Sequence, residues 1–367
     1  MGYSGYPKYT ATDKGVTHPM DWPAERLRFS ILSNPVKSEV ASWEEGTLVP
    51  FVPMEAVGEH GGIDLSKQKL IGDVYCGYTY FADGDIIIAK ITPCFENGKG
   101  AIPEGLKNGV AFGTTEFHVM RPLKGISKRW LFYLTMSDAF RNIGASEMLG
   151  AGGQKRVPET FIKDFKTGIP SPNEQQKIAD FLDWKTGQID GLIAKKKQLI
   201  EKLKEKRIAL ITQAVTKGLN PNVPMRDSGI PWLGDVPAHW EVRRLKFLAS
   251  IRYGLGEPPE YVVGGLKLIR ATDVSQGTIA RHGFKRIRPE DVPWNKNPSL
   301  CVNEIIVVRS GAYTGDSAIV PKNLEGSIAG FDMVVTATDI RPEILAWALL
   351  SRYLLEGQIY QTRLRAA

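Results

Sequence analysis

The chain of 367 residues nearly repeats itself at a distance of about 218 residues. Three segments return in the same order and at almost the same offset: 22–29 as 240–247, 84–90 as 303–309, and 98–102 as 315–319. Self-similarity of this kind predicts two modules with the same fold. Each copy holds roughly 130–150 residues, which is enough to bury a core of its own.

Each copy mixes short apolar runs with turns that are rich in glycine and asparagine. The segments 48–52 and 85–89 are predicted to be buried strands, and 130–140 is predicted to be a helix. The second copy ends on a helix-like pattern over 342–364. We therefore expect an α+β fold: two similar α+β domains separated by a long helix of the coiled-coil type.

The segment 171–218, between the two copies, has the pattern of one long helix. Ser171 and Glu174 have the spacing of a capping box, and Gly218 supplies a C-terminal stop. No proline interrupts the segment after its first turn. A continuous helix over 172–217 would be roughly 69 Å long at 1.5 Å per residue.

Apolar residues recur along this helix at steps of mostly three, four and seven, which places them on one stripe. We expect the stripe to pair with another helix, from this chain or a second one, through Ile178, Leu182, Ile189, Leu192, Leu199, Leu203 and Leu210. Gly187 and Gly191 mark the place where we expect a bend or a close approach of another helix. The helix carries ten Lys or Arg against six Asp or Glu, and this basic flank suits solvent as well as a DNA-facing or partner-facing role.

These patterns divide the chain into five parts. We expect an extended lead-in over 1–20, a first domain over 21–170, the central helix over 171–218, a linker over 219–238, and a second domain over 239–367.

Sequence motifs for catalysis and metal binding are missing. The chain has no Gly-x-x-x-x-Gly-Lys-Ser/Thr loop, no His-Glu-x-x-His, no Gly-x-Ser-x-Gly, and no glycine loop for S-adenosylmethionine after a clear strand. Asp83 and Asp85 flank a glycine in a predicted turn, and the five histidines are isolated, so packing or surface roles are expected for both groups. We predict no catalytic residue and no metal site.

The composition favours a cytoplasmic protein with a polyanionic partner. Three cysteines, odd in number and far apart, argue against a disulfide framework and fit a reducing compartment. We expect neither a signal peptide nor a membrane span, because no basic start is followed by an apolar stretch and no apolar run approaches 18 residues. The net charge of +7 is a modest indication of nucleic-acid binding.

The residues that remain suggest recognition chemistry. In each copy a predicted strand ends on a basic residue, Lys90 or Arg309, and leads into a turn of small and polar residues. Small residues let a backbone approach a phosphate, while Asn, Gln, Lys and Thr can bind phosphate oxygens or base edges. The residues predicted to bind DNA are Lys90, Asn97, Lys99, Gln154, Lys155 and Arg156 in the first copy, and Arg270, Arg309, Tyr313 and Thr314 in the second.

Five segments in and around the central helix resemble the specificity subunit of type I restriction-modification systems: 169–183, 189–190, 210–219, 227–234 and 237–242. The resemblance implies two target-recognition domains, each of which reads one half of a bipartite DNA sequence, with long helices that fix the spacing. It implies a noncatalytic protein that binds double-stranded DNA, two modification (adenine N6-methyltransferase) subunits, and restriction (translocase and nuclease) subunits. S-adenosylmethionine, ATP and Mg²⁺ would be bound by those partner subunits and not by this chain.

Full-length members of that family end with a second long helix, antiparallel to the first, and this sequence stops before an equivalent segment. The resemblance therefore implies a C-terminally shortened member. Three explanations are open: a truncated allele, a deliberately shortened chain, or an assembly in which another chain supplies the helix. The last includes self-association through the central helix.

Two other classes of function are compatible with parts of the sequence. A two-lobed protein-interaction scaffold would use the central helix to bind partners without reading DNA. A self-sufficient methyltransferase or nuclease would need the cofactor and metal motifs that are missing here.

Overall fold

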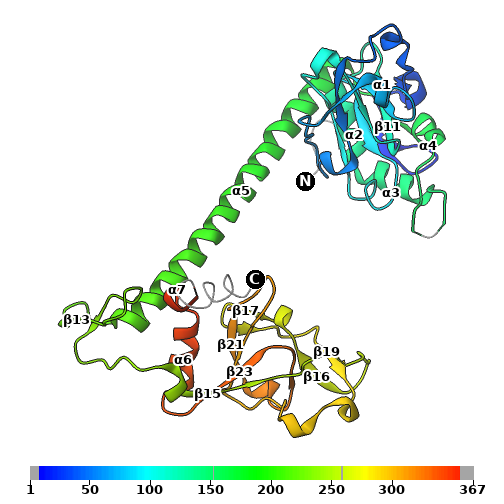
Figure 1. Cartoon of the computed structure of the whole chain (residues 1–367). Helices are drawn as coiled ribbons and strands as arrows, with labels where there is room; N and C mark the ends of the chain where they lie inside the picture. The colour runs from blue at the N-terminus through cyan, green and yellow to red at the C-terminus, as the bar shows by residue number, and fades with distance from the viewer. Residues whose placement is uncertain (1–7, 152, 258, 356–367) are drawn as a thin grey trace. The chain divides into compact units, whose positions relative to one another are not determined.

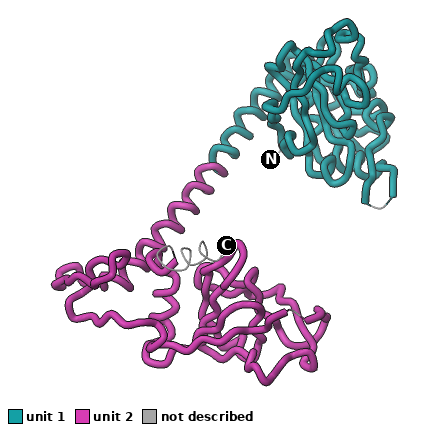
Figure 2. Tube along the Cα trace, viewed as in Figure 1, with its two compact units in different colours: residues 1–192 teal, residues 193–367 magenta. Residues whose placement is uncertain are grey.

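The computed structural model describes residues 8–151, 153–257 and 259–355 (Figure 1). The chain divides into two compact units, Met1–Leu192 and Ile193–Ala367, which Figure 2 distinguishes by colour. Helix α5 (Pro172–Lys217) belongs to both units, because the division falls within it. The expected α+β fold with a long helix between two sheet-containing domains is confirmed.

Unit 1 contains two four-stranded sheets, ordered β4-β11-β8-β9 and β6-β5-β10-β7, and two smaller two-stranded pairs, β1-β2 and β12-β3. The strands are β1 (Tyr9–Ala11), β2 (Thr17–Pro19), β3 (Ala24–Arg26), β4 (Ile31–Ser33), β5 (Leu48–Val52), β6 (Gln68–Leu70), β7 (Thr79–Ala82), β8 (Ile86–Ala89), β9 (Gly100–Ala101), β10 (Val110–Gly113), β11 (Phe117–Pro122) and β12 (Lys166–Gly168). The helices before α5 are α1 (Ile71–Val74), α2 (Lys128–Met136), α3 (Asp138–Ser146) and α4 (Glu159–Asp164).

The apolar run of β8 explains the layers of unit 1. Ile86 and Ile88 pack into a cluster with side chains of α2, α3 and α4, whereas Ile87 packs against side chains of the other sheet. Successive strand residues point to opposite faces, so a strand that is covered on both sides needs an unbroken apolar run. The predicted strands over 48–52 and 85–89 are therefore confirmed as β5 and β8.

Unit 2 carries a four-stranded sheet, β15-β23-β20-β21, a three-stranded sheet, β19-β16-β22, and two short pairs, β13-β14 and β17-β18. The strands are β13 (Met225–Asp227), β14 (Asp235–Pro237), β15 (Ala249–Tyr253), β16 (Leu266–Ile269), β17 (Val274–Ser275), β18 (Thr278–Ile279), β19 (Lys285–Ile287), β20 (Ile305–Val307), β21 (Ser317–Ile319), β22 (Ile328–Ala329) and β23 (Met333–Ala337). Its helices beyond α5 are α6 (Pro342–Leu349) and α7 (Arg352–Leu354).

The two units follow the same plan, as the repeat predicts. The order β4-β11-β8-β9 corresponds to β15-β23-β20-β21, with every neighbouring pair antiparallel in both units. The parallel pair β5–β10 likewise corresponds to β16–β22. The registers agree: Ile86 lies opposite Met120 in unit 1, and its repeat equivalent Ile305 lies opposite Val335 in unit 2.

Two segments expected to be plain connections are hairpins instead. Within 1–20, β1 pairs with β2, and Val16 and His18 are buried. Within 219–238, β13 pairs with β14, and Val236 is buried. The repeat offset relates the two hairpins, so each unit has its own copy. Both were expected to be irregular because their strands of three residues are too short to show a period.

Two helix predictions need correction. The segment 130–140 is not one helix: Ser137 has an extended backbone, and its side chain accepts a hydrogen bond from the backbone of Phe140, so it caps α3 after α2 has ended. The segment 342–364 gives α6 and the short α7, separated by the extended Ser351. The part of that prediction from 356 onward lies outside the described residues.

The prediction of one helix over 172–217 is confirmed in its bounds. Ser171 and Glu174 form the expected capping box: the Ser171 hydroxyl accepts from the Glu174 backbone, and the Glu174 carboxylate accepts from the Ser171 backbone, both at 3.4 Å. Gly218 follows the last turn with φ +78°, a conformation that favours glycine. Gly187 and Gly191, where a bend was expected, are both assigned to the helix.

Candidate nucleic-acid interface

In unit 1, the segment after β8 and the loop before α4 come together. Ile91 forms a β-bridge with Arg156, the Thr92 amide donates to the Lys155 carbonyl at 3.0 Å, and the Val157 amide donates to the Lys90 carbonyl at 2.8 Å. The loop also closes on itself, because Leu149 and Arg156 exchange two backbone hydrogen bonds. The structure therefore gathers Lys90, Lys155 and Arg156, which are up to 66 residues apart in the sequence.

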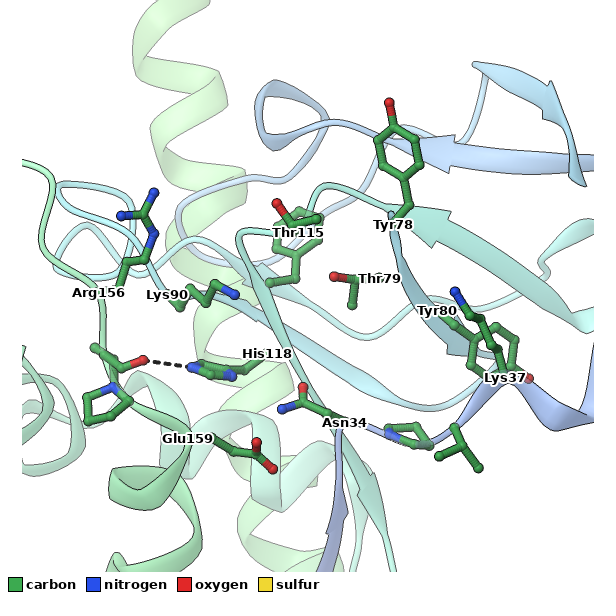
Figure 3. Close-up of a pocket in the computed structure, with 15 residues that line it drawn as sticks. Asn34, Lys37, Tyr78, Thr79, Tyr80, Lys90, Thr115, His118, Arg156 and Glu159 are labelled. Carbon is green, nitrogen blue, oxygen red and sulfur yellow. Dashed lines mark hydrogen bonds between the residues drawn. The ribbon is translucent and has the colours of Figure 1, made fainter. Parts of the chain in front are cut away.

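Lys90 and Arg156 line a pocket of about 620 Å³ (Figure 3). The pocket lies wholly within unit 1, and its lining combines cations, hydroxyl and amide groups, and aromatic rings. Its other labelled lining residues are Asn34, Lys37, Tyr78, Thr79, Tyr80, Thr115, His118 and Glu159. A volume of this size falls in the range of small-molecule sites, roughly 300–1,000 Å³.

The charges around the pocket are only partly compensated. Arg156 donates to both carboxylate oxygens of Glu116: Nε to Oε2 at 2.9 Å and to Oε1 at 3.1 Å, and Nη2 to Oε1 at 2.8 Å. The bound guanidinium lowers the pKa of Glu116, so this carboxylate is charged at neutral pH. Lys90 forms neither a hydrogen bond nor an ion pair through its side chain within the described part of the chain. Lys90 is therefore available to an anion or a polarised ring.

A second group of lysines extends the basic surface of unit 1. Lys69 Nζ lies 4.1 Å from the ring centroid of Phe51 and 5.3 Å from that of Tyr78, and Lys67 Nζ lies 5.6 Å from the Phe51 ring. Lys37 Nζ lies 4.7 Å from the Tyr75 ring. Reasoning from sequence missed these lysines, because their aromatic partners Phe51, Tyr75 and Tyr78 come from other segments of the chain. Their Lys-x-Lys spacing in and before β6, which puts both on one face, was the available signal.

Two predicted DNA-binding residues of unit 1, Asn97 and Lys99, do not line the pocket with Lys90 and Arg156. The Asn97 side chain donates to Glu59 Oε1 at 3.1 Å, and Lys99 Nζ donates to the Met54 carbonyl at 3.1 Å. Both therefore hold the turn against the segment 54–59. Gln154 and Lys155 are exposed beside Arg156. Whether any of these side chains contacts DNA remains a prediction.

In unit 2, Arg309 lies between two aromatic rings. Its guanidinium carbon is 3.5 Å from the ring centroid of Phe331 and 5.1 Å from that of Tyr253, and both rings are about half exposed. Tyr313 is exposed in the following turn. The group of Tyr253, Arg309 and Phe331 thus presents aromatic rings and one cation, a combination that stacks on bases and attracts phosphates.

The other two predicted residues of unit 2 have structural partners. Thr314 is buried, and its hydroxyl donates to the Gly311 carbonyl at 2.7 Å, so it stabilises the turn from inside. Arg270 donates to Asp273 through Nε and Nη2, each at 3.1 Å. Hydrogen bonding to that carboxylate raises the pKa of Arg270, which remains a cation at any ordinary pH. Arg270 stays a candidate for phosphate contact, whereas Thr314 is poorly placed for one.

The apolar stripe of α5 is divided between two uses. Ile178 packs against the core of unit 1, and the adjacent Ala179 is fully buried, so the first turns of the helix belong to that unit. Leu182 is half-buried. The remaining residues of the predicted stripe are each exposed by at least half: Ile189, Leu192, Leu199, Leu203 and Leu210. Pairing of this exposed part with another helix remains a prediction.

The described residues contain no cluster of three or more His, Cys, Asp or Glu side chains that could hold a metal ion. In the same part of the chain, no helix combines the length and the apolar character needed to cross a membrane.

Comparison with known proteins points to one family. Residues 33–205 match the type I restriction modification DNA specificity domain. The specificity subunit of the type I restriction enzyme EcoAI from Escherichia coli is 40% identical over 178 residues, which cover 47% of this chain and 29% of that protein. The EcoEI specificity subunit, also from Escherichia coli, is 41% identical over 162 residues, 44% of this chain and 27% of that protein. The matched part thus spans less than a third of either relative.

A solved structure shares the fold. The chain aligns with a TM-score of 0.62 and 18% identity to a chain from work on the complex assembly and conformational transition of the type I R-M system. The alignment covers 93% of this chain and 81% of that one.

Proposed function

We propose that the chain reads a two-part sequence in double-stranded DNA, because residues 33–205 match the type I restriction modification DNA specificity domain. Unit 1 would bind one half-site and unit 2 the other. The observation that carries the proposal is the shared register of the two units, which puts Lys90 and Arg309 at equivalent strand ends. Two copies of one fold with different side chains at the same place are suited to reading two different DNA words.

The chemistry of each unit supports contact with DNA. In unit 1 the cations Lys37, Lys67, Lys69 and Lys90 supply salt-dependent affinity for phosphates. In unit 2 Arg309 and the exposed rings around it offer stacking surfaces. Exposed polar side chains on the loops, such as Gln154 and Tyr313, would provide sequence choice.

We further propose that the chain is the noncatalytic component of a larger cytoplasmic assembly. Two modification subunits would supply S-adenosylmethionine and adenine N6-methylation, and restriction subunits would supply ATP, Mg²⁺ and cleavage. The exposed residues of α5 from Ile189 to Leu210 would bind these partners or a second helix, since leucines at this spacing form a helix-pairing seam. The same exposed stripe favours the second candidate function, a scaffold that assembles proteins without reading DNA.

Selection from random duplexes distinguishes the two functions. The chain is purified together with a modification subunit and used to select from a library of random DNA. We expect a motif with two fixed words and an unspecified gap between them. Binding should also fall steeply as the salt concentration rises, because phosphate contacts release counterions. A selection that yields no two-part motif would leave the scaffold as the better account.

The noncatalytic role has its own test. The chain alone is incubated with its selected duplex and S-adenosylmethionine, and methyl transfer to adenine is measured. We expect none above background until a modification subunit is added.

A further inference from the structure

A buried histidine in the pocket of unit 1 has one ring nitrogen that the fold does not use. His118, on β11, is 5% exposed and lines the pocket (Figure 3). Its Nε2 donates to the Val157 carbonyl at 2.8 Å. Its Nδ1 has no hydrogen-bond partner among the described residues. A buried polar atom without a partner is unfavourable, so such atoms are expected to meet a complementary group.

The protonation of His118 defines what that group must be. Burial lowers the pKa of His118, so its ring is neutral at neutral pH. Because Nε2 faces a carbonyl, it must carry the proton, and Nδ1 then offers a lone pair. A ligand in the pocket that donates an N–H or O–H would therefore satisfy this nitrogen.

The mouth of the pocket is suited to a different part of the ligand. Lys90 has no side-chain partner within the described part of the chain, and Lys37 and Arg156 add positive charge. Tyr78 contributes a partly exposed ring, and Asn34 and Thr115 contribute further polar atoms to the same lining (Figure 3). A donor at one end and negative charge at the other, joined by a planar ring, is the chemistry of a nucleotide.

In unit 2, the residue equivalent to Lys90 makes a cation–π contact within the protein that Lys90 lacks in unit 1. Continued past the last paired residues, the strand registers place Glu116 opposite Lys90 and Phe331 opposite Arg309. In unit 2 the Phe331 ring stacks on the Arg309 guanidinium at 3.5 Å. In unit 1 the residue that corresponds to Phe331 is Glu116, whose carboxylate pairs with Arg156. The Lys90 ammonium therefore has no aromatic ring from this position. An external planar ring can take that place by a cation–π contact.

We propose that the pocket of unit 1 receives one nucleotide that has swung out of the bound duplex. An N–H on the Watson–Crick edge of its base donates to His118 Nδ1, the base ring lies against the Lys90 ammonium, and the phosphate stays near Lys37, which lies across the pocket from Lys90 (Figure 3). A base still in the stack cannot reach a nitrogen this deeply buried, so the base has to leave its pair. The proposal rests on the proposed DNA-reading function, because the ligand comes from the DNA.

Fluorescence of 2-aminopurine tests the proposal directly, because this base becomes brighter when it leaves the stack. It is placed in turn at each position of the selected duplex, and the complex with the modification subunits is measured. We expect a rise at one position in the unit 1 half-site that is not a methylated adenine. In His118→Phe this signal should weaken about tenfold, since a ring of similar shape cannot accept the hydrogen bond. His118→Gln, which keeps both a donor and an acceptor, should retain most of it.

Controls keep this test separate from the test of the overall function. His60→Phe changes an exposed histidine of the same unit and should leave the signal unchanged. Lys90→Gln changes the pocket mouth without disturbing the core and should also reduce the signal. It therefore replaces His118→Phe as the test if that variant does not fold. A wild-type complex that selects its two-part site but shows no rise at any such position would overturn the nucleotide proposal and leave the DNA-reading function intact. Failure to select any site would instead remove the function itself.

A free nucleotide is the other source of the same chemistry. The chain is titrated with dAMP, dCMP, dGMP and dTMP, with inorganic phosphate as the reference, by calorimetry. We expect no saturation by any of them at 1 mM concentrations, because only DNA binding brings a nucleotide to the pocket at high local concentration. Tight binding of a free nucleotide that is lost in His118→Phe would overturn the assignment to DNA.

Discussion

At the scale of single residues, both units bury an acid at the same place in the sheet. Asp85 is 1% exposed and Glu304 is 6% exposed, and the repeat relates the two. Arg121 of β11 binds Asp85 through Nε at 2.7 Å and Nη2 at 2.9 Å. In unit 2 the arginine comes from another strand, since Arg252 of β15 binds Glu304. Asp85 therefore has a structural role in the sheet.

The Asp85–Arg121 pair predicts a large loss of stability when one partner is removed. Arg121→Ala leaves the buried carboxylate with only the Ala82 amide, so we expect a decrease of about 3 kcal/mol in the free energy of unfolding of unit 1. The matched control is Arg129→Ala, which removes two ion pairs to the exposed Asp180 and Asp183 and should cost about 1 kcal/mol or less. Hydrogen exchange of peptides from β8 and β11 measures the loss of stability in both variants. Equal losses of stability in Arg121→Ala and Arg129→Ala would contradict the structural role of the Asp85–Arg121 pair.

His118 predicts a dependence of stability on pH. Burial lowers its pKa in the folded protein below the usual 6.5, so the unfolded chain binds a proton more readily. The contribution of neutral His118 is present in full above pH 6.5 and is lost as pH falls from there toward the lowered pKa. We expect protection of β11 against hydrogen exchange, corrected for the intrinsic rate, to decrease between pH 7 and 5.5 in the wild type and to stay flatter in His118→Gln. The exposed His60→Gln variant should keep the wild-type profile.

At the scale of secondary-structure elements, α5 is held at both ends by local contacts. Near its start Arg129 of α2 binds Asp180, and Gln175 donates to the Pro170 carbonyl at 2.9 Å. Near its end Arg207 donates to the Gln276 carbonyl at 2.8 Å, and the Thr212 hydroxyl accepts from the Arg352 amide at 2.9 Å. The middle of the helix, by contrast, exposes its leucines. The helix is thus anchored in each unit by residues of that unit.

Lengthening α5 should change the spacing of the DNA half-sites under the proposed function. Inserting four helix-forming residues between Leu192 and Leu199 adds about 6 Å, which corresponds to roughly two base pairs. We expect the selected motif to keep both words while its gap changes by one or two base pairs. The control is an insertion of the same four residues between the exposed Glu104 and Gly105, outside the helix. An unchanged gap in the helix variant would contradict the role of α5 as a spacer.

Sequence patterns predicted the elements that have a period or a cap and missed those that do not. The bounds of α5, its capping box and its terminal glycine followed from local chemistry, and β5 and β8 followed from unbroken apolar runs. The break at Ser137 was missed because the flanking residues continue a helical pattern while the serine caps a new helix. The pocket was missed for another reason: Lys37, Lys90 and His118 come from separate segments that only the sheet brings together.

At the scale of the whole molecule, the repeat divides recognition between two copies of one fold whose surface chemistry differs. Unit 1 combines unpaired lysine with a pocket, whereas unit 2 combines arginine with exposed rings. Equivalent backbone positions with different side chains are the means by which a duplicated fold can acquire two specificities. The proposed function therefore requires that changes in one unit leave the other half of the DNA site unaffected.

Substitution of the equivalent cations should separate the two half-sites. We expect Lys90→Gln to weaken or alter one word of the selected motif and Arg309→Gln to weaken or alter the other. If either cation contacts a phosphate, its removal should also lower the salt dependence by about one counterion. Selection from random duplexes at two salt concentrations measures both effects, with the exposed Lys124→Gln as the control. If both variants alter the same word, the proposal that each unit reads a different half-site is contradicted.

The paired hairpins β1–β2 and β13–β14 identify where the chain can be cut and rejoined. Because β13–β14 repeats β1–β2 and buries Val236, the folded part of unit 2 that follows α5 begins by Met225 and includes this hairpin. A hybrid that imports a different second lobe should be joined between Gly218 and Pro224. A hybrid joined near residue 239 would combine the β13–β14 hairpin of one protein with the second domain of another. The two parts would not be matched to each other, and we expect such a hybrid not to acquire the new specificity.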